Sequence, residues 1–156
     1  MSGVFVTGTD TGVGKTEIAA GLLAGFKARG ISAVGMKPVA SGCTPGDDGL
    51  QADDAIKLMA AGSVDAPYDE VNPIALADPI APHIAAGQAG VDVRLGHIRQ
   101  AYTALAHRAE RVVVEGVGGW RVPLGPALAV SDLPDALGIP VVLVVGLRLG
   151  CLNHSL

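Results

Sequence analysis

The sequence has few aromatic residues, few cysteines, no basic cluster and no apolar run of membrane-spanning length. Aromatic residues make up 3% of the chain, so a buried core has to consist of Val, Ile, Leu and Ala. With a formal net charge of −4 and no basic cluster, neither nucleic acid nor an anionic membrane surface is an expected partner. The longest apolar run, 139–147, contains Pro140 and Gly146 and is too short to span a bilayer, so we expect a buried strand there.

The two cysteines, Cys43 and Cys151, make neither a disulfide framework nor a metal site. No targeting signal is visible at the N-terminus, and a cytoplasmic location is therefore the expectation. Apolar residues nevertheless make up 49% of the 156 residues and charged residues only 17%, which is typical of a folded globular chain. We expect a single domain over residues 1–156.

Val-rich segments alternate with segments rich in Ala and Leu along the chain. This alternation predicts an α/β fold in which helices flank a parallel sheet. Segments 44–49 and 123–126 are expected to be loops, and 71–82 to be extended. The expected strands are Val4–Thr7, Ser32–Met36, Arg111–Val114 and Val141–Val145, and the expected helices are Lys15–Arg29, Ala52–Ala61, Leu95–Arg108 and Leu133–Leu137.

Glycines and charged residues follow the four expected strands. The segments that follow them are Gly8–Thr16, Lys37, Glu115–Gly119 and the residues from Gly146 onward. Ligands of such sheets bind beyond the carboxyl ends of the strands, where these segments meet. A glycine-rich loop, a lysine and a carboxylate at one edge indicate a site for a phosphate compound and a divalent cation.

The stretch GTDTGVGKT, Gly8–Thr16, is typical of a phosphate-binding loop between a strand and a helix. Its backbone N–H groups are expected to bind phosphate oxygens, Lys15 to reach the β- and γ-phosphates, and the Thr16 hydroxyl to bind Mg²⁺. Thr9 departs from the usual pattern, which has glycine there; this chain has Gly8 instead. The alternative is a glycine-rich turn with a surface lysine, which the flanking strand and helix disfavour.

Further charged residues belong to the expected site, with alternatives that the spacing leaves open. Glu115 lies where phosphate-loop enzymes place a second Mg²⁺ ligand, and Lys37 is either catalytic or an exposed lysine at a strand end. For His83 a structural role at a helix start is favoured over a general base. One residue of an acidic cluster is a further candidate Mg²⁺ ligand, and the spacing does not say which. The cluster is Asp47, Asp48, Asp53 and Asp54.

Together these stretches resemble the dethiobiotin synthetase family of ATP-dependent ring-closing ligases. The resemblance rests on Gly8–Thr16, Lys37–Gly42, Val71–Pro73, Val114–Gly119 and Gly150–His154. It implies a three-layer, P-loop NTPase-like fold and a homodimer. The ligands that it implies are ATP, Mg²⁺, 7,8-diaminononanoate, and CO₂ or bicarbonate. Family chains continue past this length with further strands and a base-binding segment, so a domain truncated at the C-terminus is the expectation.

The resemblance also implies roles for individual residues. It selects Asp54 from the acidic cluster, and Ala81 departs from a serine common in the family. The implied catalytic residues are Lys15 and Lys37, and the implied Mg²⁺ ligands are Thr16, Asp54 and Glu115. Nucleotide binding is implied for Thr11, Gly12, Val13, Gly14, Lys15, Thr16, Asp54, Glu115, Gly116 and Gly118. Substrate binding is implied for Thr11 and Ser41, and across the dimer interface for Gly150, Cys151, Leu152 and Asn153.

Two other classes of protein share this kind of loop. ATPase switches of the partition and division type carry an additional lysine early in the loop, and Gly8–Thr11 contains none. Glutamine-dependent amide synthases of the cobalamin type need a glutaminase domain with a reactive cysteine, which this chain lacks. Both differences favour the ligase interpretation.

Overall fold

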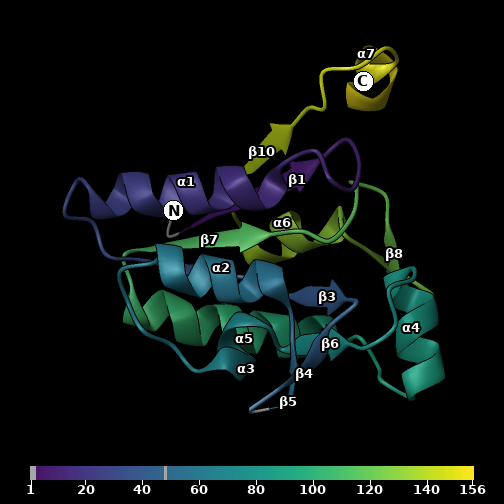
Figure 1. The fold of residues 1–156 in the computed structure, drawn as a ribbon, viewed down its shortest axis with the longest axis horizontal. Helices are drawn as coiled ribbons and strands as arrows, with labels where there is room; N and C mark the ends of the chain where they lie inside the picture. The colour runs from purple at the N-terminus through teal and green to yellow at the C-terminus, as the bar shows by residue number, and fades with distance from the viewer. Residues whose placement is uncertain (1–2, 48) are drawn as a thin grey trace.

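A four-stranded parallel sheet forms the centre of the computed structural model, which describes residues 3–47 and 49–156 (Figure 1). The strand order is β10-β1-β7-β2, and each neighbouring pair is parallel. This confirms the predicted α/β class. The strands are β1 (Gly3–Gly8), β2 (Ala33–Met36), β7 (Arg111–Glu115) and β10 (Val141–Val144).

Helices cover both faces of this sheet and produce three layers. Side chains alternate along β7, so Val113 packs with Leu23 and Leu58 on one face, while Val112 and Val114 belong to the cluster on the other. That second cluster supplies most of the core, and it contains Phe5, Ile98 and Leu105. The helices of the first face are α1 (Lys15–Lys27) and α2 (Asp53–Ala61), and those of the second are α5 (Leu95–Arg108) and α6 (Asp132–Leu137).

Shorter elements connect the layers, and here the predictions were partly wrong. Segments 44–49 and 123–126 are not simple loops, because each contributes to an antiparallel strand pair. Segment 71–82 is only partly extended, since it includes the end of one helix and the start of another. The pairs are β3 (Val39–Ser41) with β6 (Ile74–Leu76), β4 (Thr44–Gly46) with β5 (Gly49–Gln51), and β8 (Pro123–Gly125) with β9 (Leu128–Ala129). The short helices are α3 (Tyr68–Val71), α4 (Pro82–Ala89) and α7 (Cys151–Ser155).

The last strand, β10, is an edge strand of the described sheet. Val141 and Leu143 are 42% and 40% exposed, so the expectation of a buried strand was wrong. β10 pairs with β1 alone, and that single neighbour leaves one side of its backbone open. Across the described residues, no helix combines the length and apolarity that crossing a membrane requires.

Candidate functional site

A cavity of about 1030 Å³ opens at the carboxyl ends of β1, β2 and β7. The parallel arrangement brings three of the four predicted strand-end segments together here, as the sequence indicated. The fourth segment, after β10, meets the phosphate loop from the side through contacts described below. The predicted site residues that line the cavity are Thr11, Gly12, Gly14, Lys15, Thr16, Lys37, Ser41, Asp54, Glu115 and Gly118.

The loop between β1 and α1 has the backbone shape that its glycines permit. Gly12 and Gly14 have φ angles of 73° and 97°, which L side chains rarely adopt. α1 begins at Lys15 directly after this turn, and no side chain caps its N-terminus in the described structure. The first N–H groups of α1 therefore remain available to an anion, together with the positive end of the helix dipole.

Lys15 is buried within this loop. It is 6% exposed, and its Nζ donates to the carbonyl oxygen of Asp10 at 2.8 Å. Burial lowers the pKa of Lys15, and the nearby charge of Lys37 adds to that effect, although surrounding carboxylates oppose it. A buried ammonium beside the uncapped N-terminus of α1 is suited to bind a polyphosphate.

The unusual threonine at position 9 has a structural explanation. Its Oγ1 accepts a hydrogen bond from the N–H of Gly146 at 3.2 Å, and its own N–H donates to Val144 at 3.0 Å. A Cβ on Gly8 would lie 2.7 Å from Cγ2 of Val13, so glycine is needed at position 8. The displaced glycine thus allows close packing beneath the loop, while Thr9 joins the loop to the chain after β10.

Four polar side chains meet at the base of the cavity: three come from α1, α2 and β7, and Lys37 comes from the residue that follows β2. Thr16 Oγ1 lies 2.8 Å from Glu115 Oε1 and 3.1 Å from Asp54 Oδ1. Lys37 Nζ lies 2.8 Å from Glu115 Oε1 and 2.7 Å from Asp54 Oδ2. Lys37 and Glu115 are 3% and 1% exposed. Burial opposes ionisation of Asp54, but Lys37 and the Thr16 hydrogen bond outweigh it and hold the pKa of Asp54 below its ordinary value.

This cluster fits a magnesium ion. Glu115 Oε2 is buried and has no hydrogen-bond partner among the described residues, which is unfavourable for a carboxylate oxygen. Two carboxylates and a hydroxyl are oxygen ligands, and Mg²⁺ usually takes its remaining ligands from phosphate and water. Within 3–47 and 49–156 no group of three or more His, Cys, Asp or Glu side chains could hold a metal, so an all-protein metal cage is not formed there.

The remaining predicted residues lie in different places. The carbonyl of Gly116 is 3.4 Å from Lys37 Nζ, and Val13 packs against the loop beneath the cavity. Residues Gly150 to Asn153 are not among the residues that line the cavity; they lie at the start of α7, which projects beyond β10 (Figure 1). Arg148, which precedes this region, forms an ion pair with Asp10 of the phosphate loop, in addition to the hydrogen bond between Gly146 and Thr9.

The acidic cluster separates in the structure. Asp54 belongs to the base of the cavity, Asp53 lines its rim, and Asp47 is exposed in the β4–β5 hairpin. Asp48 lies outside the described residues. His83 is exposed at the second residue of α4 and does not line the cavity.

The sequence indicated no role for Tyr68, which does not line the cavity but whose hydroxyl contacts Ala52 and Asn72. It donates to Asn72 Oδ1 at 2.9 Å, and Asn72 in turn contacts the backbone of Lys37. Asn72 belongs to a segment quoted for the family resemblance, but its contact was not foreseen. The only local signal was the spacing of four residues between the two side chains, which is the spacing of neighbours on a helix face.

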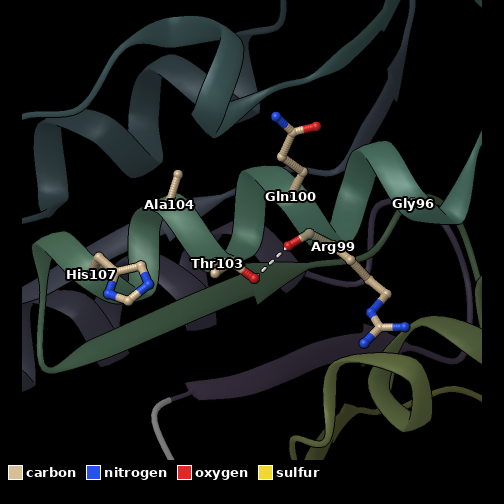
Figure 2. A pocket seen from close by; sticks show the side chains of 6 residues that line it. All are labelled: Gly96, Arg99, Gln100, Thr103, Ala104 and His107. Carbon is tan, nitrogen blue, oxygen red and sulfur yellow. Dashed lines mark hydrogen bonds between the residues drawn. The ribbon is translucent and has the colours of Figure 1, made fainter.

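A second, shallower hollow lies on the outer face of α5 (Figure 2). Its volume is about 580 Å³, and Thr103 there donates to the backbone carbonyl of Arg99 at 2.8 Å. It has no carboxylate and no phosphate loop, so it lacks the groups that the cavity at the strand ends contains. Its lining residues are Gly96, Arg99, Gln100, Thr103, Ala104 and His107.

Comparison with known proteins assigns the chain to a family. The model of a family described as "AAA domain" matches residues 2–156. An ATP-dependent dethiobiotin synthetase BioD of Xylella fastidiosa is 54% identical over 155 residues, covering 99% of this chain and 69% of the relative. Proteins of the same name from Xanthomonas oryzae pv. oryzae and Pseudomonas aeruginosa are 53% and 51% identical, over 97% and 100% of this chain and 67% and 69% of the relatives. The chain belongs to the ATP-dependent dethiobiotin synthetase family.

Proposed function

We propose that this chain is a dethiobiotin synthase that joins 7,8-diaminononanoate and CO₂ in a cyclic urea while ATP is converted to ADP and phosphate. One observation carries the proposal: Lys15, Thr16, Lys37, Asp54 and Glu115 share one cavity, in a chain that belongs to this family. The reaction needs a phosphate-binding loop and a second cationic group for an anionic substrate, and this cavity contains both.

The proposed reaction has three bond-forming steps. One amine of the substrate adds to CO₂, forming a C–N bond and releasing a proton to give a carbamate. A carbamate oxygen then attacks the γ-phosphorus of ATP, and the bond to the ADP oxygen breaks. The second amine attacks the carbonyl carbon of this mixed anhydride, loses a proton and expels phosphate, which closes the ring. Closure is intramolecular and gains from proximity, with effective molarities that reach about 10⁵ M or more in well-oriented cases.

The proposed contribution of the protein is electrostatic. The backbone donors of 11–16 and the ammonium of Lys15 bind the triphosphate and stabilise the charge that develops on it. Lys37 faces the same space from the end of β2 and stabilises the carbamate and the transferring phosphoryl group. Ser41 lines the cavity next to Lys37 and is suited to hydrogen-bond the diamine. No protein nucleophile is required.

Thr16, Asp54 and Glu115 are the residues that would hold Mg²⁺, as their oxygen atoms and the unpaired Glu115 Oε2 suggest. When bound, the ion supplies positive charge that neutralises phosphate oxygens. Asp54 is suited to this role at neutral pH, since its lowered pKa keeps it ionised.

We further propose a homodimer in which residues Gly150 to Asn153 bind the carboxylate tail of the diamine held by the partner subunit. Support comes from the apolar surface around this segment, where Leu147, Leu149 and Leu152 are 92%, 105% and 76% exposed. The molar mass in solution, measured by sedimentation over a range of concentrations, tests this assembly. A monomer at the concentrations at which the enzyme turns over would contradict it.

The proposed activity is tested by phosphate release from Mg²⁺-ATP and bicarbonate, with and without 7,8-diaminononanoate, alongside direct detection of dethiobiotin. Release that depends on the diamine and matches product formation supports the ligase. Release that is indifferent to the diamine supports the ATPase-switch alternative. If a folded protein releases no phosphate and forms no dethiobiotin, the proposed function of the chain is contradicted.

A further inference from the structure

The backbone of Lys37 leaves the sheet, and two consecutive residues bind both of its polar groups. β2 ends at Met36, and Pro38 has no N–H with which to continue a strand ladder. The N–H of Lys37 donates to the carbonyl of Val71 at 2.8 Å, and its own carbonyl accepts from Asn72 Nδ2 at 2.6 Å. Residues 71 and 72 therefore fix the peptide groups on either side of the Lys37 Cα.

The hydrogen bonds continue from Asn72 to the start of α2. Asn72 Oδ1 accepts from the hydroxyl of Tyr68 at 2.9 Å, and the oxygen of that hydroxyl accepts from the N–H of Ala52 at 2.8 Å. Because a hydroxyl has one proton, the direction of the whole chain is determined. It passes from Ala52 through Tyr68 and Asn72 to Lys37, and we call it the 52–68–72–37 relay.

One end of this relay is Lys37 itself, and the other end, Ala52, lies two residues before Asp54, the carboxylate that pairs with Lys37 in the cavity. Ala52 precedes α2 and has no side chain with which to cap it, and Asp54 is the second residue of that helix. Asp54 Oδ2 and Lys37 Nζ are 2.7 Å apart. The relay thus holds together, from behind, the backbone segments from which this ion pair projects.

We propose that Tyr68 and Asn72 are positioning residues that set the place of Lys37 relative to Asp54, and so to the reacting groups. The expected effect on turnover rests on the proposed function, but the positioning of Lys37 by Tyr68 and Asn72 does not. Neither side chain lines the cavity, so both act through Lys37 and α2.

The burial of the relay supports this role. Asn72 is 3% exposed, so water cannot readily replace its bonds to Lys37 and Ile74. Burial also raises the pKa of Tyr68, which keeps its hydroxyl protonated as a donor. A satisfied buried network of this kind restricts its members to one geometry.

The kinetic test compares Tyr68→Phe with Tyr102→Phe, since these two tyrosines are the only ones in the chain. Tyr102 is buried and Tyr68 is half-buried, and Tyr102 packs near Gly3 at the opposite end of the sheet. Loss of the two relay hydrogen bonds of the Tyr68 hydroxyl is expected to lower kcat for dethiobiotin formation about ten-fold in Tyr68→Phe, with KM for ATP and the thermal midpoint close to those of Tyr102→Phe. An unchanged kcat, or a kcat that falls only with stability and KM, would overturn the proposal.

A second measurement needs no turnover. The ammonium protons of Lys37, followed by NMR in ¹⁵N-lysine-labelled protein, are buried and paired with two carboxylates. Tyr68→Phe is expected to accelerate their exchange with solvent about ten-fold, whereas Tyr102→Phe leaves it unchanged. Equal exchange in the two variants would overturn the positioning role. If the wild-type protein makes no dethiobiotin, the proposed function is wrong, but the exchange measurement still tests whether Tyr68 positions Lys37.

Discussion

Lys37 is held by two carboxylates in a place that water hardly reaches. The surrounding residues include Asp54 and the almost fully buried Glu115, and both contact the same ammonium. An isolated charge is unfavourable at such depth, so the opposite charges of the buried Lys37 and Glu115 offset each other's loss of hydration. A substitution at Lys37 therefore affects chemistry and stability together, and the two effects have to be measured separately.

We predict that Lys37→Ala abolishes dethiobiotin formation while ATP still binds. The phosphate loop and Lys15 remain, so nucleotide affinity measured by calorimetry should stay close to that of the wild type. Removing one partner of a buried ion pair is expected to destabilise the fold by up to about 3–5 kcal/mol. Urea denaturation measures this loss independently of activity.

The matched control for this variant is Lys27→Ala, which removes an exposed lysine from the last turn of α1. Turnover and stability of the control should both resemble the wild type. Normal turnover in Lys37→Ala would remove Lys37 from the mechanism, and loss of nucleotide binding would indicate a wider defect of the site.

Among the secondary-structure elements, β2 and α2 pack so closely that one strand residue has to be glycine. A Cβ at Gly35 would lie 2.6 Å from the Cβ of Leu58 and 3.3 Å from its backbone carbon. We predict that Gly35→Ala destabilises the protein by about 1–3 kcal/mol, because α2 has to shift. Chemical denaturation measures the change in free energy of unfolding.

The control for Gly35→Ala is the same substitution within a helix. Gly21 lies in the middle of α1, and a Cβ there would meet nothing within 4 Å. Gly21→Ala is expected to stabilise the fold by about 0.5–1 kcal/mol through helix propensity alone. Equal effects at the two positions would show that the close packing of α2 on β2 is not significant.

α3 and α5 are joined by a bidentate ion pair whose contribution depends on pH. Arg108 Nε and Nη2 donate to the two carboxylate oxygens of Glu70 at 2.7 and 2.8 Å. Hydrogen bonding from Arg108 lowers the pKa of Glu70 in the folded state. The stability that this ion pair contributes is therefore present above the ordinary pKa of a carboxyl group. It is lost as the pH falls through the lowered pKa of Glu70.

We predict that Arg108→Gln is slightly less stable than the wild type at pH 7, and that this difference is lost as the pH falls below the ordinary carboxyl pKa and through the lowered pKa of Glu70. Thermal midpoints measured across that range provide the test. Arg99→Gln, which changes an exposed arginine of the same helix, should show no such pH dependence. A difference between wild type and Arg108→Gln that stays constant with pH would assign the effect to packing.

The sequence predicted the long elements well and the short ones poorly. Val-rich segments indicated the four strands of the main sheet, an intervening segment rich in Ala and Leu indicated α5, and the phosphate loop indicated where the site lies. The β4–β5 hairpin escaped prediction because its strands have three residues each and β4 is entirely exposed, so apolar alternation could not mark them. The contact of Tyr68 with Ala52 escaped because it joins residues 16 positions apart through a backbone group, which leaves no trace in residue type.

At the scale of the whole molecule, the site consists of residues far apart in sequence that one topology brings together. β7 lies between β1 and β2, so Glu115 reaches Thr16 across 99 positions of the chain. Nothing local fixes that distance; it follows from the registers of two parallel strand pairs. A ligand that contacts all of these groups at once is therefore expected to stabilise the fold as a whole.

We predict that Mg²⁺ with a non-hydrolysable ATP analogue raises the thermal midpoint, and that either component alone raises it less. Binding to the folded state stabilises it by about 2.7 kcal/mol when the free ligand is at 100 times Kd. Lys15→Ala should weaken this stabilisation, because it removes the buried ammonium of the loop. An equal rise in Lys15→Ala and wild type would count against the assignment of the phosphate loop. A rise that the analogue produces equally well with EDTA present would instead count against Thr16, Asp54 and Glu115 as the magnesium ligands, since their contribution depends on the ion being there to join them to the phosphates.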